Sequence, residues 1–219
     1  MGRRKKYIEL PTGCLSYSQV SLWLSSPKRY KQIFFEQDES ARFMNDGMRF
    51  GKRVADAFEF DEKTGDLLID AAMSLVPVYD VRDKEITGEM KTKSGWLKIV
   101  SHPDMFDSKT KALREIKTGK VKWTQKKADN WFQVKFYAML IYIIHGVVPP
   151  TAHLDWIETF VDPEDGETKP TGHVETFKIE MNMKIILETM AITIKAAKEI
   201  ELEWLTYTPE VNEFTKWKK

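Results

Sequence analysis

Hydrophobic and polar positions alternate along the chain in two different ways, and each pattern predicts a different kind of element. Helical spacing and capping residues predict helices over residues 16–24, 27–35, 40–60, 128–145 and 183–205. Strand-like runs between turn-forming residues predict strands over residues 84–91, 96–106, 112–118, 152–160 and 173–179. Residues 61–82 are ambiguous, because they fit a short helix over 66–75 and the start of a strand over 78–81.

Capping and turn residues support these boundaries. Ser16 can cap the first helix, Pro27 suits the first turn of the second, and Gly47 is a point at which the third can break. The helix over 128–145 is apolar on nearly all sides, so we expect it to be buried, and Gly146 suits its C-terminal end. Short turns join the first three strands, which predicts an antiparallel meander.

The order of these elements predicts an α/β fold in which a central mixed sheet of about five strands is flanked by helices. A chain of 219 residues fits one elaborated domain. We therefore expect a loose N-terminal lead-in over residues 1–14, a single domain over 15–208 and a mobile tail over 209–219. The acidic run over 162–167 is expected to form a turn between the last two strands.

Charge and cysteine content narrow the chemistry. The net charge is +1, but residues 109–135 contain nine basic and two acidic residues, a net +7 that leaves −6 for the rest. Such a segment is either a solvated face or a surface for the phosphates of a nucleic acid. Cys14 is the sole cysteine, which excludes an internal disulfide and any metal site that needs several thiolates from one chain. We therefore expect oxygen atoms to hold any metal ion.

The hydrophobic runs are too short to cross a bilayer, including the nearly apolar stretch over 136–144. The first residues are basic, but no apolar segment follows them, so they do not resemble a secretory signal. We therefore expect a cytoplasmic protein with no membrane partner.

Two acids and a lysine lie close together in the predicted hairpin. Glu115 and Lys117 share one face of a strand while Ile116 turns into the core, and Asp104 lies near the end of the preceding strand. Two converging carboxylates suit a hard divalent cation such as Mg²⁺, and the lysine can orient water and offset charge on a phosphate. The simpler alternative is a surface hairpin with a salt bridge.

These residues belong to a longer series of short motifs. The series reads L-S-Y-S at 15–18, S-P-K-R-Y at 26–30, P-D at 103–104, E-I-K at 115–117, T-G-K at 118–120 and Q-x-x-x-Y at 133–137. Over roughly residues 15–145 it resembles the PD-(D/E)XK nucleases, and in particular their RecB-type exonuclease branch.

The resemblance implies a restriction-endonuclease-like core and a metal-dependent deoxyribonuclease, with an exonuclease role in DNA recombination, repair or phage DNA processing. It implies that Mg²⁺ or Mn²⁺ is held by Asp104, Glu115 and the Ile116 carbonyl, that Lys117 positions the nucleophile, and that Gln133 and Tyr137 line the site. A buried, hydrogen-bonded pair in a core helix is the other interpretation of the last two.

The chain departs from the family pattern at several positions. Ala55 stands four residues after Gly51, where the family often has a metal-binding histidine. Glu59, one helical turn further on, is a candidate replacement ligand or an ordinary surface glutamate. Ser101 replaces a glycine usual before the aspartate, and His102 points to the same strand face as the acid although the family needs no ligand there.

Nucleic acid is the expected partner. Lys120, Lys122, Lys126 and Lys127 are expected to contact backbone phosphates, with Trp123 interleaved among them. The sequence contains no P-loop, so a helicase or recombination protein in a bacterial or phage-infected cell would be a separate partner. The missing histidine motivates an alternative, a DNA-binding or assembly factor with little turnover; a scaffold that binds no nucleic acid is a third. The oligomeric state stays open.

Overall fold

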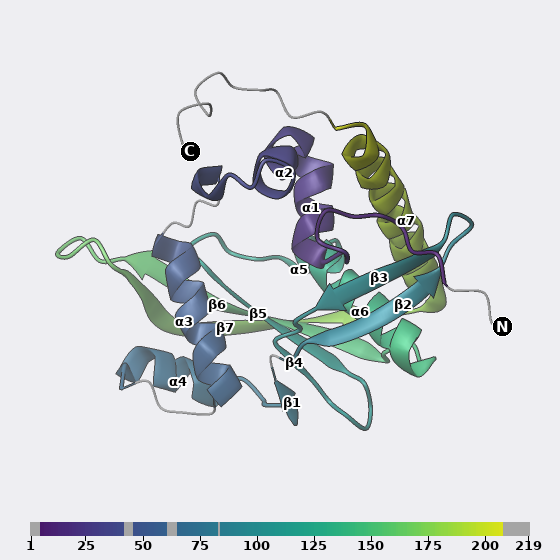
Figure 1. Ribbon diagram of the computed structural model, residues 1–219. Coiled ribbons are helices and arrows are strands. Elements are labelled where there is room, and N and C mark those ends of the chain that lie inside the picture. The colour runs from purple at the N-terminus through teal and green to yellow at the C-terminus, as the bar shows by residue number, and fades with distance from the viewer. Residues whose placement is uncertain (1–4, 42–45, 61–64, 83, 208–219) are drawn as a thin grey trace, which may run out of the picture.

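The computed structural model describes residues 5–41, 46–60, 65–82 and 84–207 (Figure 1). Its helices are α1 (Tyr17–Ser25), α2 (Pro27–Phe34), α3 (Asp46–Phe60), α4 (Leu67–Leu75), α5 (Gln125–Asp129), α6 (Phe132–His145) and α7 (Met183–Thr206), with a 3-10 turn at Glu39–Ala41. Its strands are β1 (Val81–Arg82), β2 (Ile86–Lys91), β3 (Trp96–Ser101), β4 (Met105–Phe106), β5 (Leu113–Gly119), β6 (Thr151–Val161) and β7 (Thr168–Glu180).

A five-stranded mixed sheet forms the centre of the fold, as the sequence predicts. Its strand order is β1-β4-β5-β6-β7, and β2 and β3 form a separate two-stranded sheet. β5 and β6 are parallel, while the other neighbouring strands are antiparallel. The parallel pair is joined through α5 and α6, as a parallel connection requires a crossover. The α/β class and the flanking helices are therefore confirmed.

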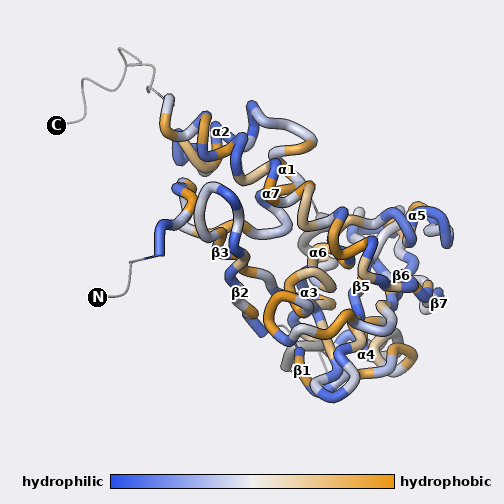
Figure 2. Tube along the Cα trace, turned by 90° about the vertical axis from the view of Figure 1, so that its right-hand side faces the viewer, coloured by the Kyte–Doolittle hydropathy of each residue, from blue (hydrophilic) through white to orange (hydrophobic). Residues whose placement is uncertain are grey.

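Helices cover both faces of this sheet. On one face, Phe50 and Val54 of α3 and Ile69 of α4 pack against Ile116 and Ile157 of the sheet. The opposite face carries the larger apolar cluster, to which α6, α7 and α1 contribute. Figure 1 shows α3 and α4 together at the lower left and α1, α2 and α7 at the top. The predicted burial of α6 is confirmed, and Figure 2 contrasts this helix with the hydrophilic α5 that precedes it.

The predicted strand over 96–106 is wrong as a single strand, because it divides at residues 102–104. β3 pairs with β2 in the small sheet, whereas β4 pairs with β5 in the large one. Pro103 cannot donate a ladder hydrogen bond, and the Ile116 amide donates to the side chain of Asp104 at 2.7 Å instead of to a backbone carbonyl. The expected meander is therefore split between two sheets.

Helix boundaries mostly follow their predicted caps. Ser16 forms a capping box with Gln19, and Gly146 ends α6 in the left-handed region at φ 70°. The helix predicted to start at residue 128 starts at Phe132 instead, because Thr124 caps the separate short helix α5 through the Lys127 amide. The short helix expected over 66–75 is α4.

Residues 5–14, the described part of the predicted lead-in, are held along β3 and are not loose. The Ile8 amide donates to the Trp96 carbonyl, and the Leu15 amide donates to the Lys98 carbonyl, both at 2.9 Å. Ile8 and Leu10 are buried in the larger apolar cluster. The tail expected over 209–219 lies outside the described residues, and the division into lead-in, domain and tail stays a prediction.

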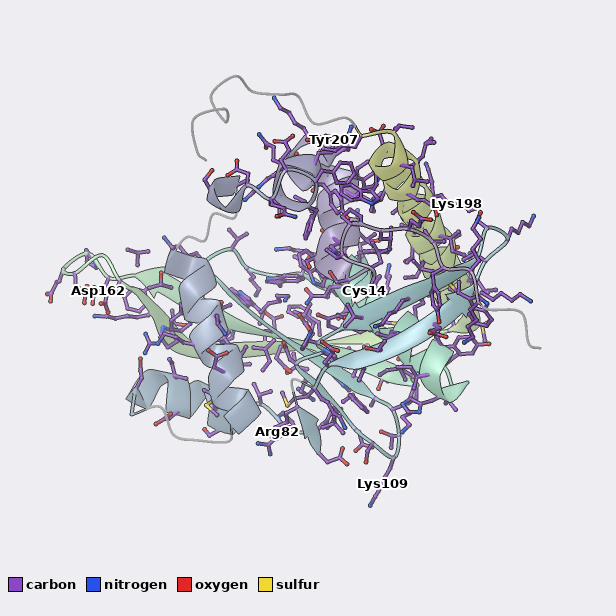
Figure 3. All side chains as sticks on the ribbon, viewed as in Figure 1. Cys14, Arg82, Lys109, Asp162, Lys198 and Tyr207 are labelled. Carbon is purple, nitrogen blue, oxygen red and sulfur yellow. The ribbon has the colours of Figure 1, made fainter. Side chains whose placement is uncertain are left out.

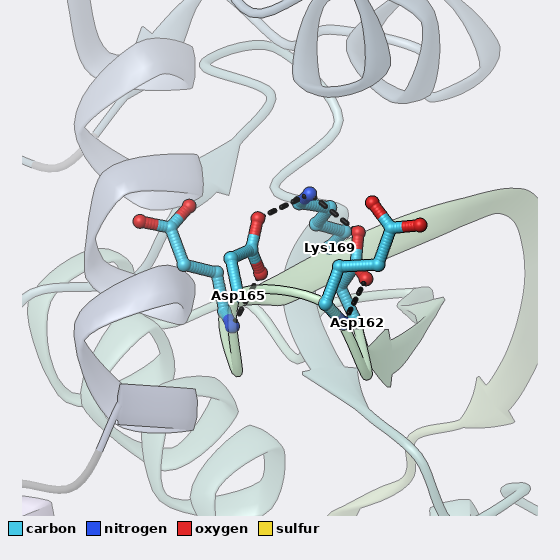
Figure 4. Close-up of polar contacts among 5 residues, drawn as sticks. Asp162, Asp165 and Lys169 are labelled. Carbon is cyan, nitrogen blue, oxygen red and sulfur yellow. Dashed lines mark hydrogen bonds and ion pairs between the residues drawn. The ribbon is translucent and has the colours of Figure 1, made fainter.

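The acidic run over 162–167 forms the turn between β6 and β7, as predicted. Lys169 holds it, because its ammonium group lies 2.6 Å from Asp162 Oδ2 and 2.7 Å from Asp165 Oδ2 (Figure 4). Gly166 takes the left-handed backbone, φ 74°, that the turn requires. In the described part of the chain, every helix is too short or too polar to cross a membrane.

Candidate active site

β5 presents two of the predicted site residues to the same side. Glu115 and Lys117 lie on one face of the strand, and Ile116 packs on the other face among the side chains of α3 and α4. The Lys117 ammonium lies 2.5 Å from Glu115 Oε1. Glu115 is 1% exposed, so this contact is not the surface salt bridge of the simpler alternative.

Asp104 reaches the same place from the break between β3 and β4. Met105 pairs with Arg114 across the antiparallel strands, which sets Asp104 opposite Glu115. The 2.7 Å hydrogen bond from the Ile116 amide fixes the Asp104 carboxylate against β5. The structure therefore brings Asp104, Glu115 and Lys117 together, although their catalytic roles stay predictions.

These three side chains lie in the wall of an open pocket of about 570 Å³. α3 contributes Gly51 and Ala55, and α6 contributes Gln133 and Tyr137. The remaining wall comes from His102 and from β5 as far as Gly119. Gly51 permits close packing, since a Cβ there would lie 3.0 Å from Thr118 Oγ1. The sequence alone gives no signal for this contact between α3 and β5.

Burial and charge repulsion together raise the pKa of the Glu115 carboxyl group. Burial, and next the charge of Asp104, raise its pKa from 4.5 to about 8. Burial lowers the pKa of the Lys117 amine, but Glu115 and Asp104 outweigh it, so the pKa is raised and the amine is cationic. With both acids ionised, two negative charges face one positive charge. Such a cluster favours the uptake of a proton or a metal cation.

One carboxylate oxygen in the pocket has no hydrogen-bond partner. Glu115 Oε2 is buried and unpaired among the described residues, whereas Oε1 contacts Lys117. An unpaired buried oxygen beside a second carboxylate suits Mg²⁺ or Mn²⁺, which take a few protein oxygens and keep several waters. The residues present therefore fit a divalent ion held mainly by Asp104 and Glu115.

The third ligand that the family resemblance implies is missing from the pocket wall. Ala55 occupies the wall where a histidine would stand, and His102, also on the wall, lies 3.4 Å from the carboxylate of Glu85. The side chain of Glu59 lies outside what the structure describes. Among the described side chains, no group of three His, Cys, Asp or Glu is placed to hold one ion.

Gln133 and Tyr137 form a hydrogen-bonded pair on a core helix and also line the pocket, so the two interpretations of the Q-x-x-x-Y motif are compatible. The Gln133 side-chain amide donates to the Tyr137 hydroxyl at 2.6 Å, and both residues line the pocket. Burial, and next the charge of Glu115, raise the pKa of the Tyr137 phenol, so it keeps its proton. Ser101, at the end of β3, lies near enough to the Tyr137 phenol to lower its pKa slightly against these effects. The sequence gives no signal for this proximity, because the two residues lie on separate elements.

Tyr17 is a second neighbour of the site that the sequence did not single out. Its ring packs against Phe132, Phe136 and Tyr137 of α6, with centroids 6.1 to 6.3 Å apart. The only sequence signal for Tyr17 is its place in the L-S-Y-S motif at 15–18. In the structure its ring packs α1 against α6.

The predicted nucleic-acid contacts fall into different environments. Lys120 and Lys126 are exposed, and exposed Lys122 lies 3.5 Å from the carboxylate of Glu175. Lys127 Nζ lies 3.9 Å above the ring of Trp123. These four lysines follow the C-terminal end of β5, the end that lines the pocket.

Trp123 is buried and does not offer a free ring face. It is 5% exposed and packs edge-on against Trp131 with centroids 4.9 Å apart. Trp123 therefore supports Lys127 and is not placed to stack on a base. The +7 segment is also divided. Lys109, at the bottom of Figure 3, and Lys111 precede β5, Arg114 and Lys117 lie on it, and the remaining lysines follow its far end.

Comparisons with known proteins give a distant structural likeness. No protein-family model and no curated protein matches the sequence. The structure is similar to the alkaline exonuclease LHK-Exo from Laribacter hongkongensis, with 16% identity and a TM-score of 0.43, covering 88% of this chain and 90% of that one. It is also similar to a protein described as an exonuclease from Eubacterium rectale, with 11% identity and a TM-score of 0.37, covering 91% and 77%. At this level the likeness assigns neither an activity nor a substrate to this chain.

Proposed function

We propose that this chain is a metal-dependent deoxyribonuclease of the PD-(D/E)XK type that hydrolyses phosphodiester bonds. The resemblance of its motifs to the RecB-type branch further suggests an exonuclease in DNA recombination, repair or phage DNA processing. The observation that carries the proposal is the unpaired, buried Glu115 Oε2 beside Asp104 and Lys117 in one open pocket. A buried carboxylate oxygen that has no hydrogen-bond partner costs stability, which favours a ligand for that oxygen.

The proposed roles follow the positions of the side chains. Asp104, Glu115 and the Ile116 carbonyl would hold one or two Mg²⁺ or Mn²⁺ ions, with Glu59 as a further candidate. When bound, such an ion would polarise the phosphate and lower the pKa of a coordinated water. The Lys117 ammonium would orient the attacking water and offset charge that develops on the phosphate.

Residues around this centre would position the substrate. Gln133 and Tyr137 would fix the strand, since both carry polar groups on the pocket wall and Tyr137 keeps its proton. The exposed lysines after β5 would contact flanking phosphates, namely Lys120, Lys122, Lys126 and Lys127. Any helicase or recombination protein would be a separate partner.

The test is cleavage of linear and closed circular DNA with Mg²⁺ or Mn²⁺, for the wild type and Lys117→Ala. We expect the wild type to release nucleotides from linear DNA only, and Lys117→Ala to lose at least about a hundredfold in rate. Lys184→Ala, an exposed lysine on α7, is the control and should cleave normally. Equal cleavage by wild type and Lys117→Ala would remove this lysine from the mechanism.

A second candidate is a DNA-binding or assembly factor with a nuclease fold and little turnover. Ala55 on the pocket wall favours it, because the described side chains then offer two carboxylates and no third ligand. This candidate predicts steeply salt-dependent DNA binding with no metal-stimulated release of nucleotides. Metal-dependent nucleotide release that Glu115→Gln abolishes would exclude it.

A further inference from the structure

A second cavity lies at the other end of β3 from Asp104. It has a volume of about 770 Å³, opens between the β2–β3 turn and α7, and shares no lining residue with the candidate active site. Lys91 and Lys93 line it from the hairpin, and Lys198 lines it from α7. Figure 3 labels Lys198 on this helix. We call the cavity the three-lysine pocket. Thr92 and Ile194 complete its wall.

The lysines of this pocket are exposed and have no acidic partner. None of the three takes part in an ion pair among the described residues, whereas nearby Lys5 and Lys195 are paired with Glu89 and Glu199. Three ammonium groups around one cavity repel each other unless an anion lies between them. The pocket is therefore suited to a polyanion with closely spaced charges.

We propose that the three-lysine pocket binds backbone phosphates of the nucleic acid strand or duplex that enters the candidate active site. This inference rests on the proposed nuclease function, because that function supplies the phosphate-rich ligand. The pocket would act as a remote anchor. It would raise the affinity for long substrates without touching the bond that is cleaved.

β3 sets the distance between the anchor and the active site. Trp96, at the start of β3, pairs with Lys91, and Asp104 follows three residues after the end of β3 at Ser101. At about 3.3 Å per residue, the extended strand from Trp96 to Ser101 alone spans roughly 16 Å, and the path on to Asp104 spans at most roughly 26 Å. A stem of about 4 base pairs, roughly 14 Å long, is shorter than β3, whereas a duplex of about 24 base pairs is longer than the whole path.

The experiment compares a test variant with a control of equal charge change. The test variant is Lys91→Ala/Lys93→Ala/Lys198→Ala. The control is Lys84→Ala/Lys178→Ala/Lys184→Ala, three exposed lysines that line neither pocket and lie outside the +7 segment. Binding is measured by fluorescence anisotropy in EDTA, so that nothing is cleaved, with a duplex of about 24 base pairs and a hairpin whose stem has about 4.

We expect the test variant to bind the long duplex about tenfold more weakly at low salt, with a log–log salt slope shallower by about 2 to 3. Its affinity for the short hairpin should match the wild type. The control should bind both ligands as the wild type does. Lys91→Arg/Lys93→Arg/Lys198→Arg should keep the wild-type affinity, since it keeps the charges.

The other outcomes overturn the inference in distinguishable ways. If the test variant binds the long duplex like the control, the pocket is no anchor, although the proposed nuclease function stands. Equal loss on the short hairpin would show a simple anion site or a general field effect, which also refutes the remote anchor. If the wild type binds neither ligand, the proposed function and this inference fall together.

Discussion

The buried Glu115 predicts an unusual dependence of stability on pH in the metal-free protein. Its pKa is raised from 4.5 to about 8 in the folded chain. The folded state therefore holds a proton that the unfolded state releases, so stability falls as pH rises through this window. The perturbation that isolates the effect is Glu115→Gln, which keeps the size of the side chain and removes its charge.

The expected magnitude follows from linkage. One group can lower the free energy of unfolding by at most about 1.4 kcal/mol per pH unit. A pKa shift of this size therefore lowers the free energy of unfolding by roughly 3 to 5 kcal/mol between about pH 4.5 and pH 8. The free energy of unfolding of a typical domain is roughly 5 to 15 kcal/mol in total, so this loss is a large part of it. Glu115→Gln should lack this loss and should be the more stable protein at alkaline pH without metal.

The assay is urea unfolding in EDTA at several values between about pH 5 and pH 8.5, with the difference between wild type and variant taken at each pH. Glu164→Gln, in the exposed β6–β7 turn, is the matched control and should follow the wild type. The reasoning on the Glu115 pKa would be refuted if the free energies of unfolding of wild type and Glu115→Gln differed by the same amount at every pH in this range. It would mean that Lys117 keeps Glu115 ionised throughout.

Metal binding offers a second way to measure the proton that Glu115 holds in the folded protein. An ion that displaces the proton should stabilise the wild type more strongly as the pH rises from about 6 to 8. Calorimetry in buffers of different ionisation enthalpy should detect up to one proton released per bound Mn²⁺. Glu115→Gln should show neither the extra stabilisation nor the proton release.

Three other positions give outcomes that stability and binding measurements can check. Gly95→Ala places a Cβ 2.7 Å from the Lys6 carbonyl oxygen, so thermal unfolding should show a loss of roughly 1 to 3 kcal/mol, and an unchanged Tm would contradict this packing. Asp155→Ala leaves the buried Arg114 without its partner at 2.6 Å, so urea unfolding should show a loss of about 3 to 5 kcal/mol. Ala55→His adds a ligand to the pocket wall and should tighten Mn²⁺ binding about tenfold by calorimetry, whereas Ala55→Leu should not.

Local patterns predicted the part of the site that lies on single elements. Strand alternation placed Glu115 and Lys117 on one face because side chains in a strand alternate regardless of what surrounds them. Helical spacing likewise placed Gln133 beside Tyr137, and the structure joins them at 2.6 Å. The central sheet followed from the order of helices and strands.

Features that depend on contacts distant in sequence were not predictable. Pro103 marks a point at which the strand can break, but nothing in the pattern shows that β3 and β4 belong to different sheets, because that depends on their partner strands. Trp123 looked like a stacking residue, but packing against Trp131 buries it. The three-lysine pocket unites Lys93 with Lys198, which only the packing of α7 beside the hairpin brings together.

The Asp104 carboxylate replaces a backbone carbonyl, since it accepts the hydrogen bond of the Ile116 amide where the strand ladder is interrupted. This makes one of the two acids a strand connector as well as a metal ligand candidate. Replacing Asp104 would therefore remove a connection between β4 and β5 together with a charge, whereas replacing Glu115 would leave this connection intact. Of the two acids, Glu115 is the one whose substitution tests metal binding separately from the integrity of the sheet.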